Sequence, residues 1–170
     1  MKLTGARAAR IRLLVLDVDG VLTDGGLYYG ADGESVKRFS VQDGLAMVAA
    51  RRAGLGLAVV SGRSSAAVER RLSELGVSEI HQGVGDKSAI LDDLMSRLAL
   101  RSAQVAAMGD DLSDLPLLRR VGVALAPRNA VPEVRKAAHW VAGRNGGEGA
   151  VREAIELLLR ARKAWPPRSG

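Results

Sequence analysis

Two groups of aspartates follow short apolar runs and are the side chains of this chain best suited to chemistry. Asp17 lies near the end of the run 11–18, Asp19 follows it, and Gly20 comes next. In extended backbone alternate side chains point to the same face, so both carboxylates point the same way before the chain turns at Gly20. Neighbouring carboxylates repel each other unless a cation or a shared proton compensates. The pattern indicates a site of chemistry at a strand end, with a plain acidic turn as the alternative.

The second group, Asp110, Asp111 and Asp114, opens a predicted helix after the apolar run 104–108. Acidic residues at a helix N-terminus are favourable with the helix dipole and need no ligand. Three carboxylates within five residues also suit a Mg²⁺ or Ca²⁺ site, in which Asp110 would complete an oxygen shell begun by Asp17. The chain has no cysteine and two histidines, so we expect any metal to be a hard cation held by oxygens.

Ser61 and Lys87 are candidates for binding an anion. Ser61, Gly62 and Arg63 follow the apolar run 56–60 at the start of a predicted helix, where a hydroxyl and free backbone N–H groups can hold a phosphate. A simple helix N-cap is the alternative. Lys87 also stands at a helix start, where a positive charge is unfavourable to the dipole unless it faces an anion. It is not part of a P-loop, because the glycine required directly before the lysine is absent.

Three other polar features carry weaker signals. His81 and His139 are expected to be structural or exposed rather than catalytic. The glycine-rich loop 143–149 precedes a predicted helix. It is interpreted either as a flexible connection or as a mobile flap that contacts an anion.

Short apolar runs alternate with segments of helical period, which predicts an α/β fold with a central parallel sheet and helices on both faces. The strands are expected at 11–18, 56–60, 79–82, 104–108 and 121–126, and the helices at 43–53, 64–75, 86–98, 112–120, 132–138 and 148–163. Asp43 and Ser64 are predicted N-caps, and Gly54 and Gly76 are predicted to end helices at positive φ.

A β-hairpin is predicted within 26–40, directly after the first strand. Two short β-rich segments there flank Asp32 and Gly33, a dipeptide that suits a tight turn because both residues tolerate positive φ. An isolated hairpin leaves strand edges unpaired, which favours association through them.

The length of 170 residues allows one core-bearing domain, 1–170. With 47% hydrophobic and 26% charged residues the chain has the composition of an ordinary globular protein. Aromatic residues make up 3%, too few for a surface that stacks single-stranded nucleic acid. The apolar run near the N-terminus stops at Asp17, and no stretch approaches the ~20 residues of a membrane helix, so we expect a cytoplasmic protein.

The net charge of +6 comes from the two ends of the chain. The ranges 1–12 and 160–170 hold eight basic residues and no acid, while the remaining 17 basic residues face 19 acidic ones. Basic ends on a near-neutral body predict solvated tails, and a partner-binding device is the alternative.

The order Asp-x-Asp, Ser, Lys and Gly-Asp-Asp, at successive strand ends and helix starts across 13–114, resembles the haloacid dehalogenase (HAD) superfamily of phosphatases. The resemblance implies a Rossmann-like three-layer αβα sandwich. It also implies that Asp17 is the nucleophile and that Asp19 protonates the leaving oxygen and then activates water. Ser61 and Lys87 would hold the transferring phosphoryl group.

The same resemblance implies a Mg²⁺ site. Asp17, the backbone carbonyl of Asp19 and Asp110 would be the ligands, and Asp111 and Asp114 would support them. Mg²⁺ and a lysine would neutralise the repulsion between an attacking carboxylate and a phosphate dianion.

Three phrases, 17–25, 43–45 and 146–153, are similar to the family of 3-deoxy-D-manno-octulosonate 8-phosphate (KDO 8-phosphate) phosphatases. That resemblance implies release of KDO and phosphate through an aspartyl-phosphate in lipopolysaccharide precursor synthesis. Arg63 and Arg71, with Gly62, are the expected contacts for the substrate, because arginine offers a two-pronged fork to a carboxylate.

HAD phosphatases usually carry a cap domain, and the spacing of the motifs here leaves room for the hairpin but not for a cap. We therefore expect the hairpin or a neighbouring subunit to cover the site in a homo-oligomer, by resemblance and symmetry a tetramer. A basic C-terminal tail at about 160–170 contains Pro166-Pro167 near its end, which departs from the family pattern. Two alternatives stay open: a phosphatase of a nine-carbon 2-keto-3-deoxy sugar acid phosphate, and a catalytically silent HAD-like oligomerisation or regulatory module.

Overall fold

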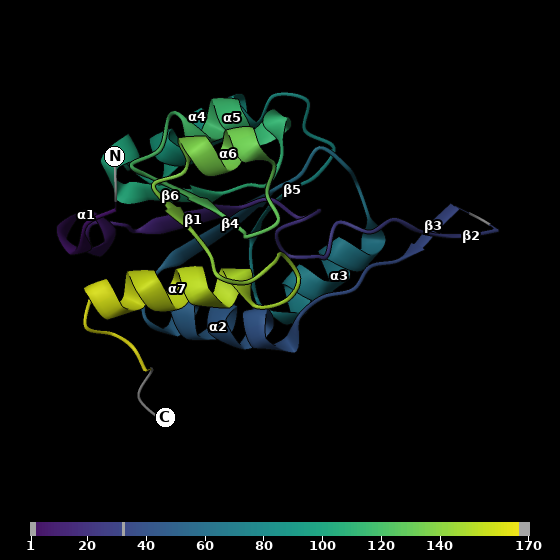
Figure 1. The fold of residues 1–170 in the computed structure, drawn as a ribbon, viewed down its shortest axis with the longest axis horizontal. Coiled ribbons are helices and arrows are strands. Elements are labelled where there is room, and N and C mark those ends of the chain that lie inside the picture. Colours follow the sequence, from purple (N-terminus) through teal and green to yellow (C-terminus); the bar gives the residue numbers. More distant parts are fainter. Residues whose placement is uncertain (1–2, 32, 167–170) are drawn as a thin grey trace.

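The structure, a computed structural model, describes residues 3–31 and 33–166 and is built around a six-stranded parallel sheet (Figure 1). The strand order is β5-β4-β1-β6-β7-β8. The strands are β1 (Leu13–Leu16), β4 (Gly56–Val60), β5 (Glu79–His81), β6 (Val105–Met108), β7 (Val123–Ala126) and β8 (Trp140–Val141). The first five confirm the predicted strands, most of them with shorter bounds, and β8 was not predicted. A two-residue strand is too short to produce a recognisable hydrophobic pattern.

Helices cover both faces of the sheet, as the alternation of segments predicts (Figure 1). The helices are α1 (Gly5–Ala9), α2 (Val41–Arg52), α3 (Ala66–Glu74), α4 (Lys87–Arg97), α5 (Leu115–Leu118), α6 (Pro132–Ala137) and α7 (Ala150–Ala161), with short 3₁₀ helices η1 (Ser102–Gln104) and η2 (Leu112–Asp114). The predicted helix 112–120 is thus a 3₁₀ turn followed by one turn of α-helix.

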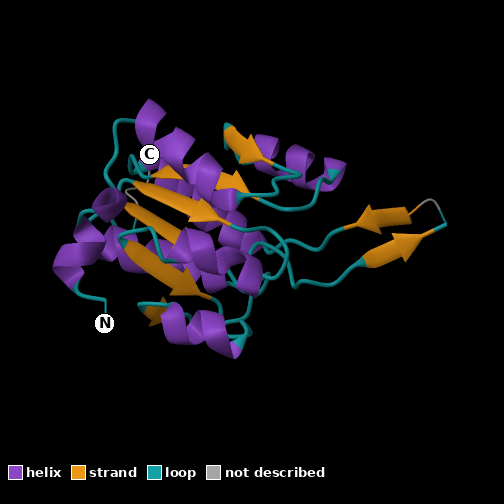
Figure 2. Ribbon diagram, turned by 90° about the horizontal axis from the view of Figure 1, so that it is seen from above, coloured by secondary structure: helices purple, strands orange, loops and turns teal. Residues whose placement is uncertain are grey.

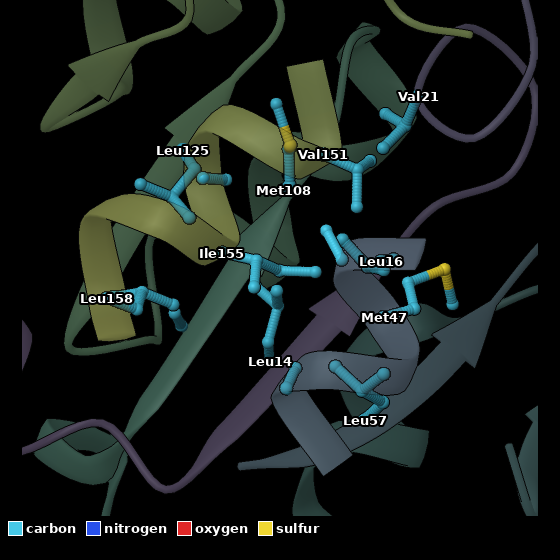
Figure 3. Packing of buried hydrophobic residues seen from close by; sticks show 14 of the residues in the cluster. Leu14, Leu16, Val21, Met47, Leu57, Met108, Leu125, Val151, Ile155 and Leu158 are labelled. Carbon is cyan, nitrogen blue, oxygen red and sulfur yellow. The ribbon is translucent and has the colours of Figure 1, made fainter. Parts of the chain in front are cut away.

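The side chains of β1 show why there are three layers. Leu14 and Leu16 lie in the cluster formed with α2 and α7, whereas Leu13 and Val15 lie in the cluster formed with α4, α5 and α6. Alternate residues of a strand face opposite sides of the sheet, so a run that is apolar at every position needs cover on both. Figure 3 shows the first cluster, where Leu14 and Leu16 meet α2 and α7.

Both predicted N-caps are wrong. The N-cap of α2 is Ser40, whose side chain accepts the backbone N–H of Asp43, and the N-cap of α3 is Ser65. Asp43 instead lies in the first turn of α2, and its carboxylate accepts backbone N–H groups at the start of another helix. The predicted helix ends are confirmed, since Gly54 and Gly76 have φ of +71° and +69°.

The N-terminal basic stretch is not the solvated tail that its charge predicts. From Leu3 onward it is tied to the body, because Leu3 donates its backbone N–H to His139 and Ala8 of α1 is buried. At the other end Arg162 donates to the carbonyl of Ala53, and the partly buried Trp165 packs against the core. Residues 167–170 of the predicted tail lie outside the described residues.

The predicted hairpin is confirmed as β2 (Tyr28–Gly30) and β3 (Gly33–Val36), and it projects from the body at one end (Figure 2). Gly33 has φ +104° but pairs with Gly30, so it belongs to the strand rather than to the turn. Asp32 lies outside the described residues. None of the described helices has the length and apolarity to cross a membrane.

Candidate active site

A cavity of about 330 Å³ opens where β1, β4 and β6 end. The carboxyl ends of parallel strands meet at one edge of the sheet, where open α/β folds bind their ligands. The lining residues are Asp17, Asp19, Gly25, Ser61, Gly62, Arg63, Val84, Gly85, Lys87, Asp110, Asp111 and Ser113. Every predicted catalytic residue lies here, together with Gly25 and Ser113, which sequence reasoning did not single out.

Lys87 forms the centre of a buried ion-pair network. Its Nζ lies 2.7 Å from Asp17 Oδ1 and 2.6 Å from Asp114 Oδ1, and all three residues are buried. Lys87 is the first residue of α4, after the N-cap Asp86, so the start of the helix aims the ammonium at the end of β1. Burial opposes the charge, but the two aspartates outweigh it and raise the pKa of Lys87. Lys87 therefore stays cationic beside the carboxylate of Asp17.

Asp114 holds the second aspartate loop in place. Its Oδ2 accepts the backbone N–H groups of Asp110 and Asp111, at 2.9 and 3.3 Å. Its Oδ1 is taken by Lys87. With both oxygens satisfied, Asp114 fits the supporting position expected for it.

Asp17, Asp110 and Asp114 each offer an oxygen within 4.8 Å of the others. Burial, followed by the charge of Asp114, raises the pKa of Asp17 to about 6. Burial, followed by the charge of Asp17, raises the pKa of Asp110 to about 7. Three crowded carboxylates with one ammonium leave negative charge uncompensated, and oxygen donors suit a hard divalent cation. The donor set therefore fits Mg²⁺.

Gly20 sets how closely the two aspartate loops approach each other. A Cβ at this position would collide with the carboxylate of Asp110, and the residue has φ +83°. Only glycine combines that backbone conformation with the space that Asp110 requires. The turn after Asp19 thus brings the first aspartate loop against the second.

Asp19 is held by two cations. Lys37, at the base of the hairpin, lies 2.6 Å from Asp19 Oδ1, and its side chain is 2% exposed. Arg63 Nε lies 3.7 Å from Asp19 Oδ2. Sequence reasoning missed Lys37, because it lies inside the hairpin and no local pattern relates it to Asp19.

Ser61 is buried at the end of β4, and its Oγ accepts the backbone N–H of Arg63. Gly62 and Arg63 follow it along the cavity wall. Arg71 does not line the cavity; its guanidinium packs against Gly44 of α2 and lies 3.4 Å from Glu74. Its predicted contact with substrate therefore does not follow from the geometry of this chain.

The glycine-rich loop 143–149 packs against the back of the first aspartate loop. Gly147 donates its backbone N–H to Val21, Gly146 donates to Asn129 Oδ1, and a Cβ at Gly146 would collide with the carbonyl of Gly20. The loop is therefore hydrogen-bonded and packed against the segment after β1, and these contacts favour a fixed support over the mobile flap that was one interpretation of it.

The two histidines lie away from the cavity, as expected. His81 contacts Glu79 at 3.1 Å, and His139 Nδ1 accepts the backbone N–H of Ala124.

Comparisons with known proteins agree with this geometry. The haloacid dehalogenase-like hydrolase family matches residues 73–155. The KDO 8-phosphate phosphatase of Escherichia coli K12 is 42% identical over 92% of this chain and 83% of its own length. The crystal structure of the Yersinia pestis phosphatase has a TM-score of 0.94 at 38% identity, covering 98% of this chain and 90% of that chain. The Moraxella catarrhalis phosphatase, in complex with magnesium, phosphate and KDO, has a TM-score of 0.92 at 40% identity, covering 95% and 92%.

The fold and the arrangement of the four motifs are those of a haloacid dehalogenase-like hydrolase. Within that class, the chain belongs to the KDO 8-phosphate phosphatase family.

Proposed function

We propose that this protein is a Mg²⁺-dependent phosphatase that converts KDO 8-phosphate to KDO and phosphate. The observation that carries the proposal is the contact of Lys87 with Asp17 at the floor of the cavity, beside Asp110. This arrangement supports the proposal, because a nucleophilic carboxylate, a phosphate-binding ammonium and a cation site would then share one small volume. The 42% identity to a KDO 8-phosphate phosphatase supports the choice of substrate.

In the first half-reaction a carboxylate oxygen of Asp17 attacks phosphorus, and the bond from phosphorus to the sugar oxygen breaks. Asp19 gives its proton to that leaving oxygen. Lys87 and Ser61 hold the phosphoryl oxygens, and Lys87 offsets the negative charge that gathers in the transition state.

In the second half-reaction water attacks phosphorus of the aspartyl-phosphate, and Asp19 takes a proton from the water. The bond from phosphorus to Asp17 breaks, which releases phosphate and restores the carboxylate. Asp17, the Asp19 carbonyl and Asp110 would hold Mg²⁺, with Asp111 and Asp114 in support, and the ion would supply positive charge that screens the phosphoryl oxygens.

We propose that arginines bind the carboxylate of the sugar acid. Arg63 lines the cavity wall beside Gly62 and is about half exposed, so it can reach a carboxylate above the phosphate. Arg71 faces α2 in this chain, and we propose it as a contact for substrate only within an assembly.

We further propose that the chain acts as one domain, 1–170, within a cytoplasmic homo-oligomer, by symmetry a tetramer. The projecting hairpin carries exposed Tyr28, Tyr29 and Val36, and its strands leave edges unpaired. Association through the hairpins would cover these apolar side chains and the mouth of the cavity. Size-exclusion chromatography with light scattering tests the assembly: a monomer at micromolar concentration would contradict it.

Phosphate release tests the activity. KDO 8-phosphate, its nine-carbon analogue and an aryl phosphate are compared with Mg²⁺ and with EDTA, for the wild type, for Asp17→Asn and for the exposed control Asp93→Asn. We expect metal-dependent turnover of KDO 8-phosphate that is lost in Asp17→Asn and kept in Asp93→Asn. Faster turnover of the nine-carbon analogue would show that the nine-carbon sugar acid phosphate, and not KDO 8-phosphate, is the preferred substrate. No turnover of any ester would indicate a silent module.

A further inference from the structure

A second polar cavity lies at the opposite edge of the sheet, near the amino ends of β6 and β7. It has a volume of about 530 Å³ and lies between α1 and the segment that follows α5. Among its lining residues are Thr4, Arg7, Arg10, Ser102, Arg119 and Arg120; we call it the rear basic cavity. Figure 1 shows α1 at the end of the body opposite the hairpin. The rear basic cavity is therefore distinct from the catalytic one.

The charges in the rear basic cavity have one sign. None of its described lining residues is acidic, and four of them are arginines. Arg120 Nη2 contacts Asp92 Oδ1 at 2.6 Å on the neighbouring helix. Arg7, Arg10 and Arg119 form no ion pair with any of the described residues. Three guanidinium groups that share a hollow without a counter-charge repel one another, and a bound anion would relieve that repulsion.

Arg7, which lines the rear basic cavity, is only partly satisfied by the protein. Its Nη1 is buried and has no hydrogen-bond partner among the described residues. A buried donor without a partner costs free energy, and a shift of the Arg7 side chain toward the cavity would let a bound anion accept from it. Burial and then the charge of Arg7 hold the pKa of His139 below its ordinary value, as expected beside an uncompensated guanidinium.

The arginines come from two distant parts of the sequence that the fold holds in place. Thr4 caps α1 through the backbone N–H of Arg7, and Leu3 is bonded to His139, so Arg7 and Arg10 sit on an anchored helix. Arg119 directly follows α5. A site on anchored elements loses less conformational entropy on binding than a solvated tail would.

We propose that the rear basic cavity is a second ligand site that binds a small polyanion carrying two or more phosphate groups. Several guanidinium forks without a carboxylate suit phosphate oxygens, which accept paired N–H donors. The volume lies in the range of small-molecule sites, about 300–1,000 Å³. The cavity has no aromatic side chain among its described lining, so it recognises the phosphates rather than a stacked base.

Tripolyphosphate is the probe for this site, titrated calorimetrically into the whole protein in EDTA. The pocket variant is the triple substitution of Arg7, Arg10 and Arg119 by Gln. The matched control replaces three exposed arginines elsewhere, Arg52, Arg70 and Arg135, by Gln and so changes the net charge equally. Ser61→Ala serves as the active-site control.

We expect the wild type to bind tripolyphosphate and the pocket variant to bind it roughly tenfold or more weakly, because charge-assisted hydrogen bonds are lost. The control triple variant and Ser61→Ala should bind as the wild type does. If the pocket variant does not fold, the single exposed substitution Arg119→Gln should show a smaller loss of the same sign.

Three results would overturn the proposal. The first is no binding by the wild type. The second is an equal loss in the pocket and control variants, which would indicate general attraction to net charge. The third is a loss confined to Ser61→Ala, which would assign the probe to the catalytic cavity. Phosphatase activity is measured separately without the probe, so failure of this site leaves the proposed function untouched.

Discussion

Asp43, in the first turn of α2, accepts a hydrogen bond of 2.7 Å from the backbone N–H of Arg152, in the first turn of α7. Its other oxygen accepts the N–H of Gly149, the residue at the N-cap of α7, which has no capping side chain. An aspartate from one helix thus caps another that lies 106 positions or more away in the sequence. Gly149 is also the last residue of the loop 143–149, so the same contact fixes the end of the loop that packs against Gly20.

Removing this cap should destabilise the protein. We expect Asp43→Ala to lower the free energy of unfolding by about 1–3 kcal/mol, because two backbone donors of α7 lose their acceptor in a buried setting. Denaturant unfolding measures the change. Asp93→Ala is the control; this exposed aspartate forms an i,i+4 ion pair with Arg97, and its loss should cost less than about 0.5 kcal/mol. Equal losses in the two variants would contradict the assigned cap.

Lys37 should matter for catalysis although it belongs to the hairpin. We expect Lys37→Met to lower kcat by about 10²-fold, because Asp19 then loses the ammonium that holds its carboxylate, and general acid–base steps are worth about 10²–10⁴. Lys37→Arg should restore part of the rate. Lys136→Met, at an exposed position of α6, is the control. Steady-state kinetics that show an unchanged kcat in Lys37→Met would remove Lys37 from the positioning of Asp19.

The close approach at Gly20 gives a test of the metal site. Gly20→Ala should weaken Mg²⁺ binding and activity by at least about 10-fold, because the new Cβ displaces the Asp110 carboxylate. Gly54→Ala is a matched control: its φ of +71° is similar to the +83° of Gly20, but nothing lies within 4 Å of a Cβ there. Denaturant unfolding compares the backbone strain, which both variants share, and calorimetric titration with Mg²⁺ measures the metal binding, which only Gly20→Ala should weaken.

Mg²⁺ affinity should rise with pH. The metal-free protein holds the pKa of Asp17 at about 6 and that of Asp110 at about 7, above the ordinary 3.8 of both carboxyls, so Mg²⁺ must displace protons below about pH 7. The same raised pKa values stabilise the metal-free fold at low pH, and this contribution is lost as pH rises from about 4 to about 7.

Thermal unfolding in EDTA and in Mg²⁺ across this range checks both signs. The stabilisation by Mg²⁺ should grow between pH 5 and pH 8, because Asp17 and Asp110 lose their protons near pH 6 and pH 7. Asp110→Asn should flatten the dependence, because the group with the higher pKa no longer titrates. A stabilisation by Mg²⁺ that does not change with pH would contradict the raised pKa values of Asp17 and Asp110.

The sequence by itself determined the fold class and most of the polar residues that line the cavity at the carboxyl ends of the strands. Apolar runs such as 56–60 correspond to buried parallel strands, and polar residues directly after parallel strands must meet at one edge of the sheet. For this reason Asp17, Ser61 and Asp110 could be brought together without any knowledge of distances, and Lys87, at the helix start beyond β5, joined them through the resemblance in motif order. These signals are local, and the regular geometry of an α/β sheet converts them into a site.

The tertiary structure alone decided the contacts between residues that no local pattern relates. Asp43 looks like an N-cap of its own helix but caps α7, and Lys37 pairs with Asp19 only because the chain after β3 returns to the end of β1. The basic N-terminal stretch has the composition of a tail, yet α1 packs against α7 and brings Arg7 beside Arg119. In each case the surroundings of a charged side chain are set by segments that are distant in the sequence, which the residues near it do not encode.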